Sequence, residues 1–144
     1  NQLSADQLAR LGWTPKAHES NDDQLTRPFI LSAALYGKNG AAIAAAHDLF
    51  KANADKLASL PADIRFYVLA NEVHDFGSAD LVDELVAAYR ETTDGSYKGD
   101  LRAAVTQTPD KALLAKLIGL FKDPDTVKPQ DLRSWFYGLG LAAE

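Results

Sequence analysis

The sequence of 144 residues contains no cysteine and no methionine. Without cysteine the chain has no disulfide framework, no thiolate metal site and no cysteine nucleophile. No apolar run reaches the roughly 18–20 residues that a bilayer-spanning helix needs, and no secretory leader opens the chain. From these absences we expect no membrane contact and a cytoplasmic location, although a segment of a longer protein would not carry that protein's own leader.

Basic residues are fewer than acidic residues. The 15 Lys and Arg residues face 20 Asp and Glu residues, which leaves a formal net charge of −5. Nucleic-acid binding depends on cationic surface that neutralises phosphates, so we expect no nucleic-acid partner. The hydrophobic fraction of 47% is too high for a disordered chain. The length suits one folded domain, and we expect a single helical domain over residues 1–144, as a fragment of a larger C-terminal domain.

Strand signals are nearly absent, because no stretch alternates apolar and polar residues for long enough. Alanine and leucine dominate, and apolar residues recur at helical spacing. The pattern predicts an all-α fold of about eight helices, stacked as antiparallel pairs in an α-solenoid or HEAT-like superhelix. Similar helix-turn-helix units begin near Pro61, Ser96 and Pro129. The expected helix caps or first residues are Ser4, Asp22, Asn39, Pro61, Ser78, Lys98, Asp110 and Pro129.

Two of these helices carry more specific expectations. Leu25, Phe29 and Ala33 have helical spacing within residues 22–36, where Pro28 predicts a kink or a late start. Residues 110–121 are apolar nearly all round, which predicts a central helix.

Both ends of the chain bear on its organisation. The chain opens on Asn1, and residues 135–141 are among its most apolar stretches. A terminal helix of a helical array should carry a polar outer face. We therefore expect a segment of a longer protein, with more protein packed beyond Glu144.

No recognisable catalytic or metal motif is present. The three histidines, His18, His47 and His74, are far apart, and the zinc motif H-E-x-x-H is missing. No serine lies in a G-x-S-x-G elbow, and Gly37-Lys38-Asn39-Gly40 lacks the spacing of a phosphate loop. The acidic group Asp80, Asp83 and Glu84 lies where the first turn of a helix favours negative charge. We assign no catalytic and no metal-binding residue.

A few polar positions stand next to apolar faces. Arg65 lies between Ile64 and Phe66, and Gln130 and Asp131 open the last predicted helix. Structural roles account for them best, namely bridging adjacent turns and meeting free backbone donors. The alternative is that they line a substrate or partner surface. With Arg27 they form the set of cavity-lining or structural polar positions: Arg27, Arg65, Gln130 and Asp131.

Several segments together resemble one family. They occur in order over nearly the whole chain: Leu11-Gly12-Trp13 before an acidic loop, Leu25-Thr26-Arg27, the short turn before an Ala-rich helix ending at Phe50, Leu60-Pro61-Ala62-Asp63-Ile64-Arg65, Tyr89, residues 101–110, and Val127-Lys128-Pro129-Gln130-Asp131. The sequence is thereby similar to the C-terminal helical domain of aminopeptidase N-type zinc aminopeptidases, whose helix starts include an "LPxDLR" pattern. Each motif alone is a cap or turn signature, and Pro28 departs from the pattern.

The resemblance implies a large hydrolase that removes N-terminal residues from peptides. In that family the zinc site, the G-x-M-x-N loop and the catalytic tyrosine belong to an earlier domain, so none is carried over to this sequence. The resemblance implies a zinc ion in the catalytic domain of the same polypeptide, and peptides as substrates. It further implies a HEAT-like C-terminal array that covers the active-site cavity and limits substrate access.

Two alternatives remain open at this point. The chain is a stand-alone helical-repeat module that binds a protein or peptide, or it is an all-α enzyme with an unrecognised site. The coding sequence on either side discriminates, because an upstream H-E-x-x-H motif supports the aminopeptidase interpretation.

Overall fold

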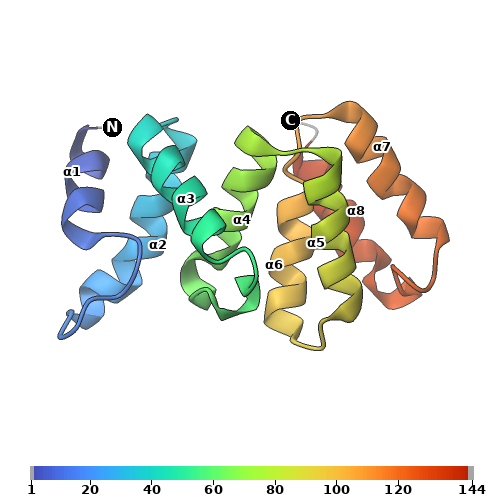
Figure 1. Cartoon of the computed structure of the whole chain (residues 1–144), viewed down its shortest axis with the longest axis horizontal. Coiled ribbons are helices and arrows are strands. Elements are labelled where there is room, and N and C mark those ends of the chain that lie inside the picture. The colour runs from blue at the N-terminus through green and yellow to red at the C-terminus, as the bar shows by residue number, and fades with distance from the viewer. Residues whose placement is uncertain (1, 143–144) are drawn as a thin grey trace. The chain divides into compact units, whose positions relative to one another are not determined.

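The computed structural model describes residues 2–142, and within that range it contains eight α-helices, three short 3₁₀ helices and no strand (Figure 1). The all-α prediction and the helix number are confirmed. The chain divides into two compact units, residues 1–71 and 72–144, and the division falls within one helix. The expectation of one domain over 1–144 stays a prediction.

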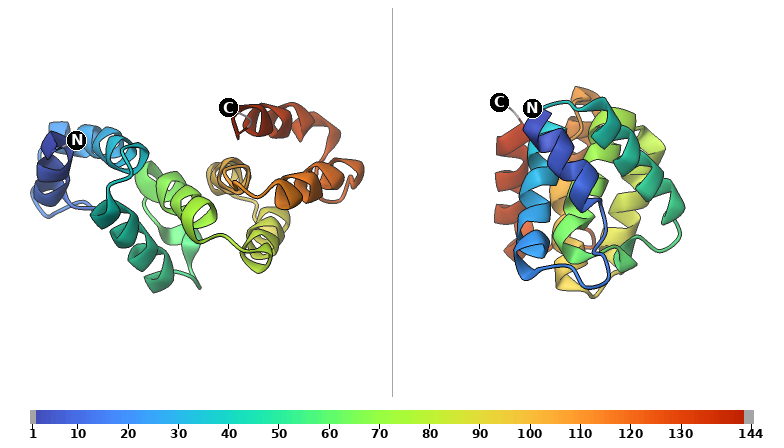
Figure 2. Two further views of the ribbon diagram at one scale, coloured as in Figure 1. Left: turned by 90° about the horizontal axis from the view of Figure 1, so that it is seen from above. Right: turned by 90° about the vertical axis from the view of Figure 1, so that its left-hand side faces the viewer.

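The first unit holds α1 (Gln2–Leu11), α2 (Asn21–Tyr36), α3 (Gly40–Ala52), the 3₁₀ helix η1 (Leu57–Ser59) and most of α4 (Ala62–Phe76). Helices α1 and α2 pack against each other, as do α2 and α3 (Figure 2). Their shared core contains Leu8, Leu31, Ala34, Ala42 and Ile64. The alanines let the helices approach closely, because they add little volume between the backbones.

The second unit holds the end of α4, then α5 (Ala79–Glu91), α6 (Gly95–Val105), α7 (Lys111–Gly119), η2 (Leu120–Lys122), η3 (Pro129–Asp131) and α8 (Leu132–Ala142). Helices α5 and α6 form an antiparallel hairpin, and α6 also packs against α8 (Figure 1). The consecutive antiparallel pairing is consistent with a solenoid-like helical domain.

Trp135 of α8 lies at the centre of the second core and is completely buried. Its ring meets Tyr89 edge-on at 5.2 Å and Phe121 at 6.1 Å between centroids. Its indole Nε1 donates a hydrogen bond of 3.2 Å to the Tyr89 hydroxyl. One aromatic side chain therefore connects α5, η2 and α8.

Most helix starts follow the predicted capping chemistry. Asn39, Ser78 and Asp110 each accept hydrogen bonds from the first turn of the helix they precede, as expected. Three starts differ from expectation. Pro129 opens the 3₁₀ helix η3, and α8 begins only at Leu132. Ser4 lies inside α1, and α6 begins three residues before Lys98 because Asp94 caps it.

The structure corrects two further expectations. Helix α2 starts at Asn21, capped by Ser20, and continues through Pro28, so a late start at the proline is wrong. Helix α7 is not central, because it buries Leu113 and Leu117 while Ile118 is about half exposed. An apolar composition all round the helix did not distinguish the buried side from the open one.

No single helix within residues 2–142 is long and apolar enough to cross a membrane. Helices α2 and α3 reach the required length and hydropathy only when taken together, and they are bent by 114° at the break between them.

Candidate functional site

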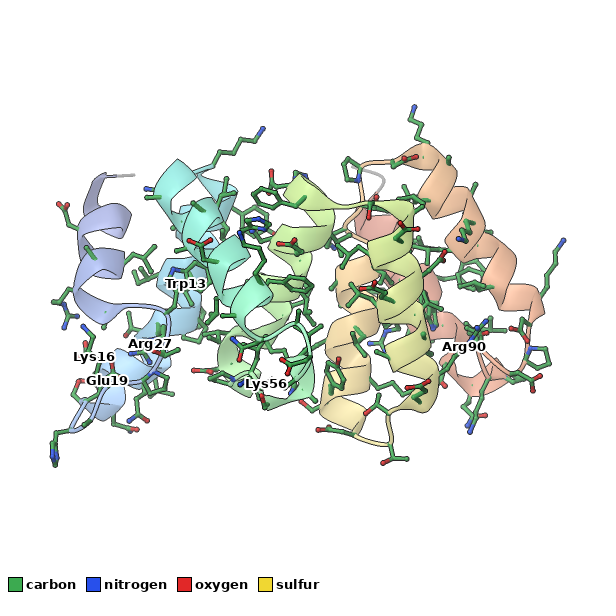
Figure 3. The ribbon with its side chains drawn as sticks, in the orientation of Figure 1. Trp13, Lys16, Glu19, Arg27, Lys56 and Arg90 are labelled. Carbon is green, nitrogen blue, oxygen red and sulfur yellow. The ribbon has the colours of Figure 1, made fainter. Side chains whose placement is uncertain are left out.

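Arg27 is the most deeply buried of the four polar positions singled out in the sequence. Its side chain lies in α2 and is fully buried, and its guanidinium pairs with the carboxylate of Glu19. Its Nε donates to the carbonyl of Gly12 at 3.2 Å, and Nη2 donates to the carbonyl of Leu11 at 3.4 Å. Arg27 thus joins α2, the end of α1 and the loop between them (Figure 3).

The loop of residues 12–20 needs this anchor because its backbone is unusual. Gly12 and His18 both adopt the left-handed region, with φ of 72° and 63°. Glycine takes that conformation at no steric cost, whereas it is uncommon for other residues, with histidine among the more tolerant. Lys16 adds a hydrogen bond from its ammonium group to the carbonyl of Arg10. The loop is therefore held through backbone carbonyls as well as through Glu19.

The pair formed by Arg27 and Glu19 is incompletely satisfied. Nη1 of Arg27 and Oε2 of Glu19 are buried and have no hydrogen-bond partner among the described residues. A buried charge pair stabilises a fold only where good geometry offsets desolvation of both ions. Its position inside the first unit suits the structural role that was considered for Arg27, and cavity lining by Arg27 stays a prediction.

Arg65 is also buried, at 3% exposed, in the first turns of α4. Its Nη1 donates to the carbonyl of Ala58 at 3.0 Å, so it secures the segment before α4. Ala58 is the middle residue of the short helix η1, which precedes α4. Bridging of adjacent turns and substrate contact by Arg65 both stay predictions.

Gln130 and Asp131 lie apart from both arginines in the chain, in the 3₁₀ turn η3 before α8. Gln130 is exposed and Asp131 is partly buried. They belong to the second compact unit, whereas Arg27 and Arg65 belong to the first. The four positions accordingly do not form one site within either unit.

A polar network in the second unit escaped the sequence analysis. Arg90 of α5 donates from Nε to the Thr126 hydroxyl at 2.6 Å and from Nη2 to the Asp123 carboxylate at 3.2 Å. Thr126 in turn donates to Asp123. Asp123 and Thr126 are 33 and 36 positions from Arg90 in the chain, and no local pattern marks such a pairing.

Hydrogen bonding lowers the pKa of Asp123. The Thr126 hydroxyl is the main cause, and the amide of Asp125, the charge of Arg90 and the amide of Thr126 add to it against a desolvation effect. In the first unit the pKa of Asp23 is lowered mainly by its hydrogen bond from Arg10, with which it forms an ion pair at 2.8 Å. The pKa of Arg10 is raised by the same bond.

The lowered pKa of Asp123 predicts a stability that depends on acid pH. The folded state binds the proton less well than the unfolded chain, so the contribution is complete above the unfolded pKa of about 3.9 and is lost as pH falls through the folded pKa. We expect the urea midpoint to fall between pH 5 and pH 2.5, and to fall less steeply in Asp123→Asn. Urea denaturation followed by circular dichroism at each pH measures this midpoint.

Thr126→Val provides a second variant, because it removes the main cause of the shift while leaving the carboxylate in place. It should also reduce the pH dependence. Identical pH profiles in the wild type and both variants would contradict the assignment.

No group of three or more His, Asp or Glu side chains that could hold a metal ion occurs within residues 2–142. His74 lies beside Asp75, with 3.3 Å between Nδ1 and Oδ2, on an exposed helix end. His18 takes the left-handed loop position described above.

Exposed apolar side chains are the remaining surface feature. On α2, Leu25, Phe29 and Tyr36 are 64%, 75% and 85% exposed, whereas the buried side of the helix carries Arg27, Leu31 and Ala34. The apolar spacing that predicted the helix therefore marks its open face. On α8, Phe136 and Tyr137 are also exposed.

Comparisons with known proteins address identity. The family model described as "ERAP1-like C-terminal domain" matches residues 1–144. The chain is 52% identical over 139 residues to Aminopeptidase N of Lactobacillus delbrueckii subsp. lactis, covering 96% of the chain and 16% of that protein. It is 54% identical over 137 residues to Aminopeptidase N of Lactobacillus helveticus, covering 95% of the chain and 16% of that protein.

A more distant relative has a different name. Glutamyl aminopeptidase of Rattus norvegicus is 27% identical over 122 residues, covering 85% of the chain and 13% of that protein. The chain spans about one sixth of the length of the two Lactobacillus proteins. The resemblance found in the sequence is confirmed.

Proposed function

Because the chain belongs to the family of ERAP1-like C-terminal domains, we propose that it is a non-catalytic segment of the C-terminal domain of a zinc aminopeptidase that removes N-terminal residues from peptides. The match of the family model to all 144 residues carries this proposal. The identities above 50% to two proteins named Aminopeptidase N support it.

Residues outside this segment would perform the reaction. The sequence has no H-E-x-x-H motif, and the described residues offer no cluster of ligands that fits a zinc ion. The zinc of the proposed enzyme therefore belongs to the catalytic domain of the same polypeptide, which is the proposed partner of this chain.

The proposed role of the segment is to cover the active-site cavity and limit the access of peptides. Helices packed in consecutive pairs support that role, because each pair contacts mainly its neighbours and small rotations at successive joints accumulate. Elements that open and close over an active site control substrate entry and product release in many enzymes. The helices of this segment would thus act on the rate of entry and not on the chemical step.

The experiment that tests the proposal compares the purified 144-residue chain with the full-length polypeptide that its gene encodes. Hydrolysis of an aminoacyl p-nitroanilide and zinc content by elemental analysis are measured for both. We expect activity and one equivalent of zinc in the full-length protein, and neither in the 144-residue chain.

Two outcomes would overturn the proposal. One is aminopeptidase activity of the 144-residue chain that survives chelation and repurification. The other is a coding sequence that ends with this chain and has no upstream zinc motif, which would support the stand-alone binding module instead.

A further inference from the structure

One face of α2 consists of uncovered apolar side chains. Leu25, Phe29, Ala33 and Tyr36, here called the α2 stripe, lie four, four and three residues apart and therefore share one side of the helix. Ala33 is exposed, and Phe29 and Tyr36 are at least three-quarters exposed. Each aromatic side chain offers about 150–250 Å² for burial, so the stripe reaches the few hundred Å² that mark interaction sites.

The α2 stripe carries no exposed charge. Between Asp23 and Lys38 the sequence has one charged residue, Arg27, which points into the core and is fully buried. The exposed neighbours along this length are uncharged. A surface that covers the stripe without leaving a buried charge unpaired must itself be apolar and uncharged there.

Charge argues against a lipid surface as the occupant. Helices that lie on membranes combine an apolar face with Lys and Arg residues that meet anionic lipid. The stripe has no basic flank along its length, and the chain has a net charge of −5.

Area argues against a second copy. A stable interface buries about 800 Å² on each partner, whereas the stripe offers a few hundred. A contact between two parts of one polypeptide can be stable with so small an area. The covalent link between the parts removes most of the entropic cost that two separate molecules would incur on association. Relatives extend far beyond the matched segment, which is 16% of their length.

We propose that the α2 stripe is covered by an uncharged apolar surface from the part of the aminopeptidase polypeptide outside residues 1–144. This inference rests on the proposed function. The inference adds a defined contact surface to that function, with Phe29 at the centre and Leu25 and Tyr36 on either side.

Photocrosslinking in the full-length polypeptide identifies the occupant. p-Benzoylphenylalanine replaces Phe29, or Ala44 as a control at an exposed position of α3. After irradiation, mass spectrometry of the digest locates the crosslinked peptide. We expect the Phe29 position to crosslink within the same chain, to a peptide outside residues 1–144, and the Ala44 position not to crosslink to that peptide.

Other crosslinks overturn the inference. A covalent dimer would assign the stripe to a second copy, an adduct with lipid in vesicles of anionic phospholipid would assign it to a membrane, and no crosslink would leave it open to solvent. These results are read in protein whose aminopeptidase activity and zinc content are intact, so failure of the contact is distinguished from failure of the proposed function.

A substitution provides an independent measurement. Phe29→Ser should leave the thermal midpoint of the 144-residue chain unchanged but lower that of the full-length protein by several degrees, because only the latter buries the side chain. Ala44→Ser is the matched control and should change neither. Equal effects of Phe29→Ser in both proteins would overturn the inference.

Discussion

Replacing Arg27 with methionine is expected to lower the free energy of unfolding by about 3–5 kcal/mol, the cost of leaving one ion of a buried pair alone. The substitution leaves the carboxylate of Glu19 without its cation in a site that is 4% exposed. It also removes the donors to the carbonyls of Leu11 and Gly12. Urea denaturation followed by circular dichroism measures the loss, and the fluorescence of Trp13 in the anchored loop reports on the first unit.

The double variant Arg27→Met with Glu19→Gln tests whether the uncompensated charge causes the loss. It removes both charges and should recover a substantial part of the stability, because replacing a buried pair as a whole is often nearly neutral. A single and a double variant that are equally unstable would contradict this explanation.

Arg10 and Asp23 provide the matched exposed pair, since they are joined by an ion pair of 2.8 Å in the same unit with the Arg10 side chain 61% exposed. Arg10→Met should change stability far less than Arg27→Met does, since water solvates the remaining carboxylate. A similar loss in the free energy of unfolding for Arg10→Met and Arg27→Met would show that burial does not determine how much each ion pair stabilises the fold.

Replacing Trp135 with alanine is expected to destabilise the second unit by about 3–5 kcal/mol, the range for large aromatic side chains in cores. The indole is fully buried against rings of α5 and η2, and its removal leaves a cavity between three elements. Urea denaturation followed by circular dichroism measures the change. Trp13 is then the remaining tryptophan and reports separately on the first unit.

Two variants separate the contributions at Trp135. Tyr89→Phe removes the hydroxyl that accepts the indole hydrogen bond and should cost about 1 kcal/mol. Phe136→Ala changes the next residue, which is 58% exposed, and should cost less than Trp135→Ala. Equal losses for Trp135→Ala and Phe136→Ala would show that the second core is not centred on the tryptophan.

Local chemistry made the helices predictable. Asn39, Ser78 and Asp110 cap helices through their own first turns, so each signal and its partner lie within three residues of each other. The family resemblance was readable for the same reason, because its motifs are caps and turns. The start of α6 was missed because the expected start was Lys98, whereas Asp94 caps the helix four residues earlier.

The buried side of α2 was not predictable in this way. Two of its large apolar residues, Leu25 and Phe29, lie outward, while a charged arginine lies inward against carbonyls 15 and 16 positions earlier. An amphipathic pattern points to the surface that a helix buries, but it does not say whether that surface lies within the same 144 residues or elsewhere. Under the proposal above, the pattern of α2 records a contact outside them.

The sequence alone therefore determined the all-α class, the capped ends of most helices, the absence of an H-E-x-x-H zinc motif and the family, because each depends on residues close together in the chain. Only the tertiary structure decided which helix faces are buried and which charges are paired. Arg27 with Glu19 and Arg90 with Asp123 meet through packing of separate elements, and the energy of each pair depends on how far that packing excludes water.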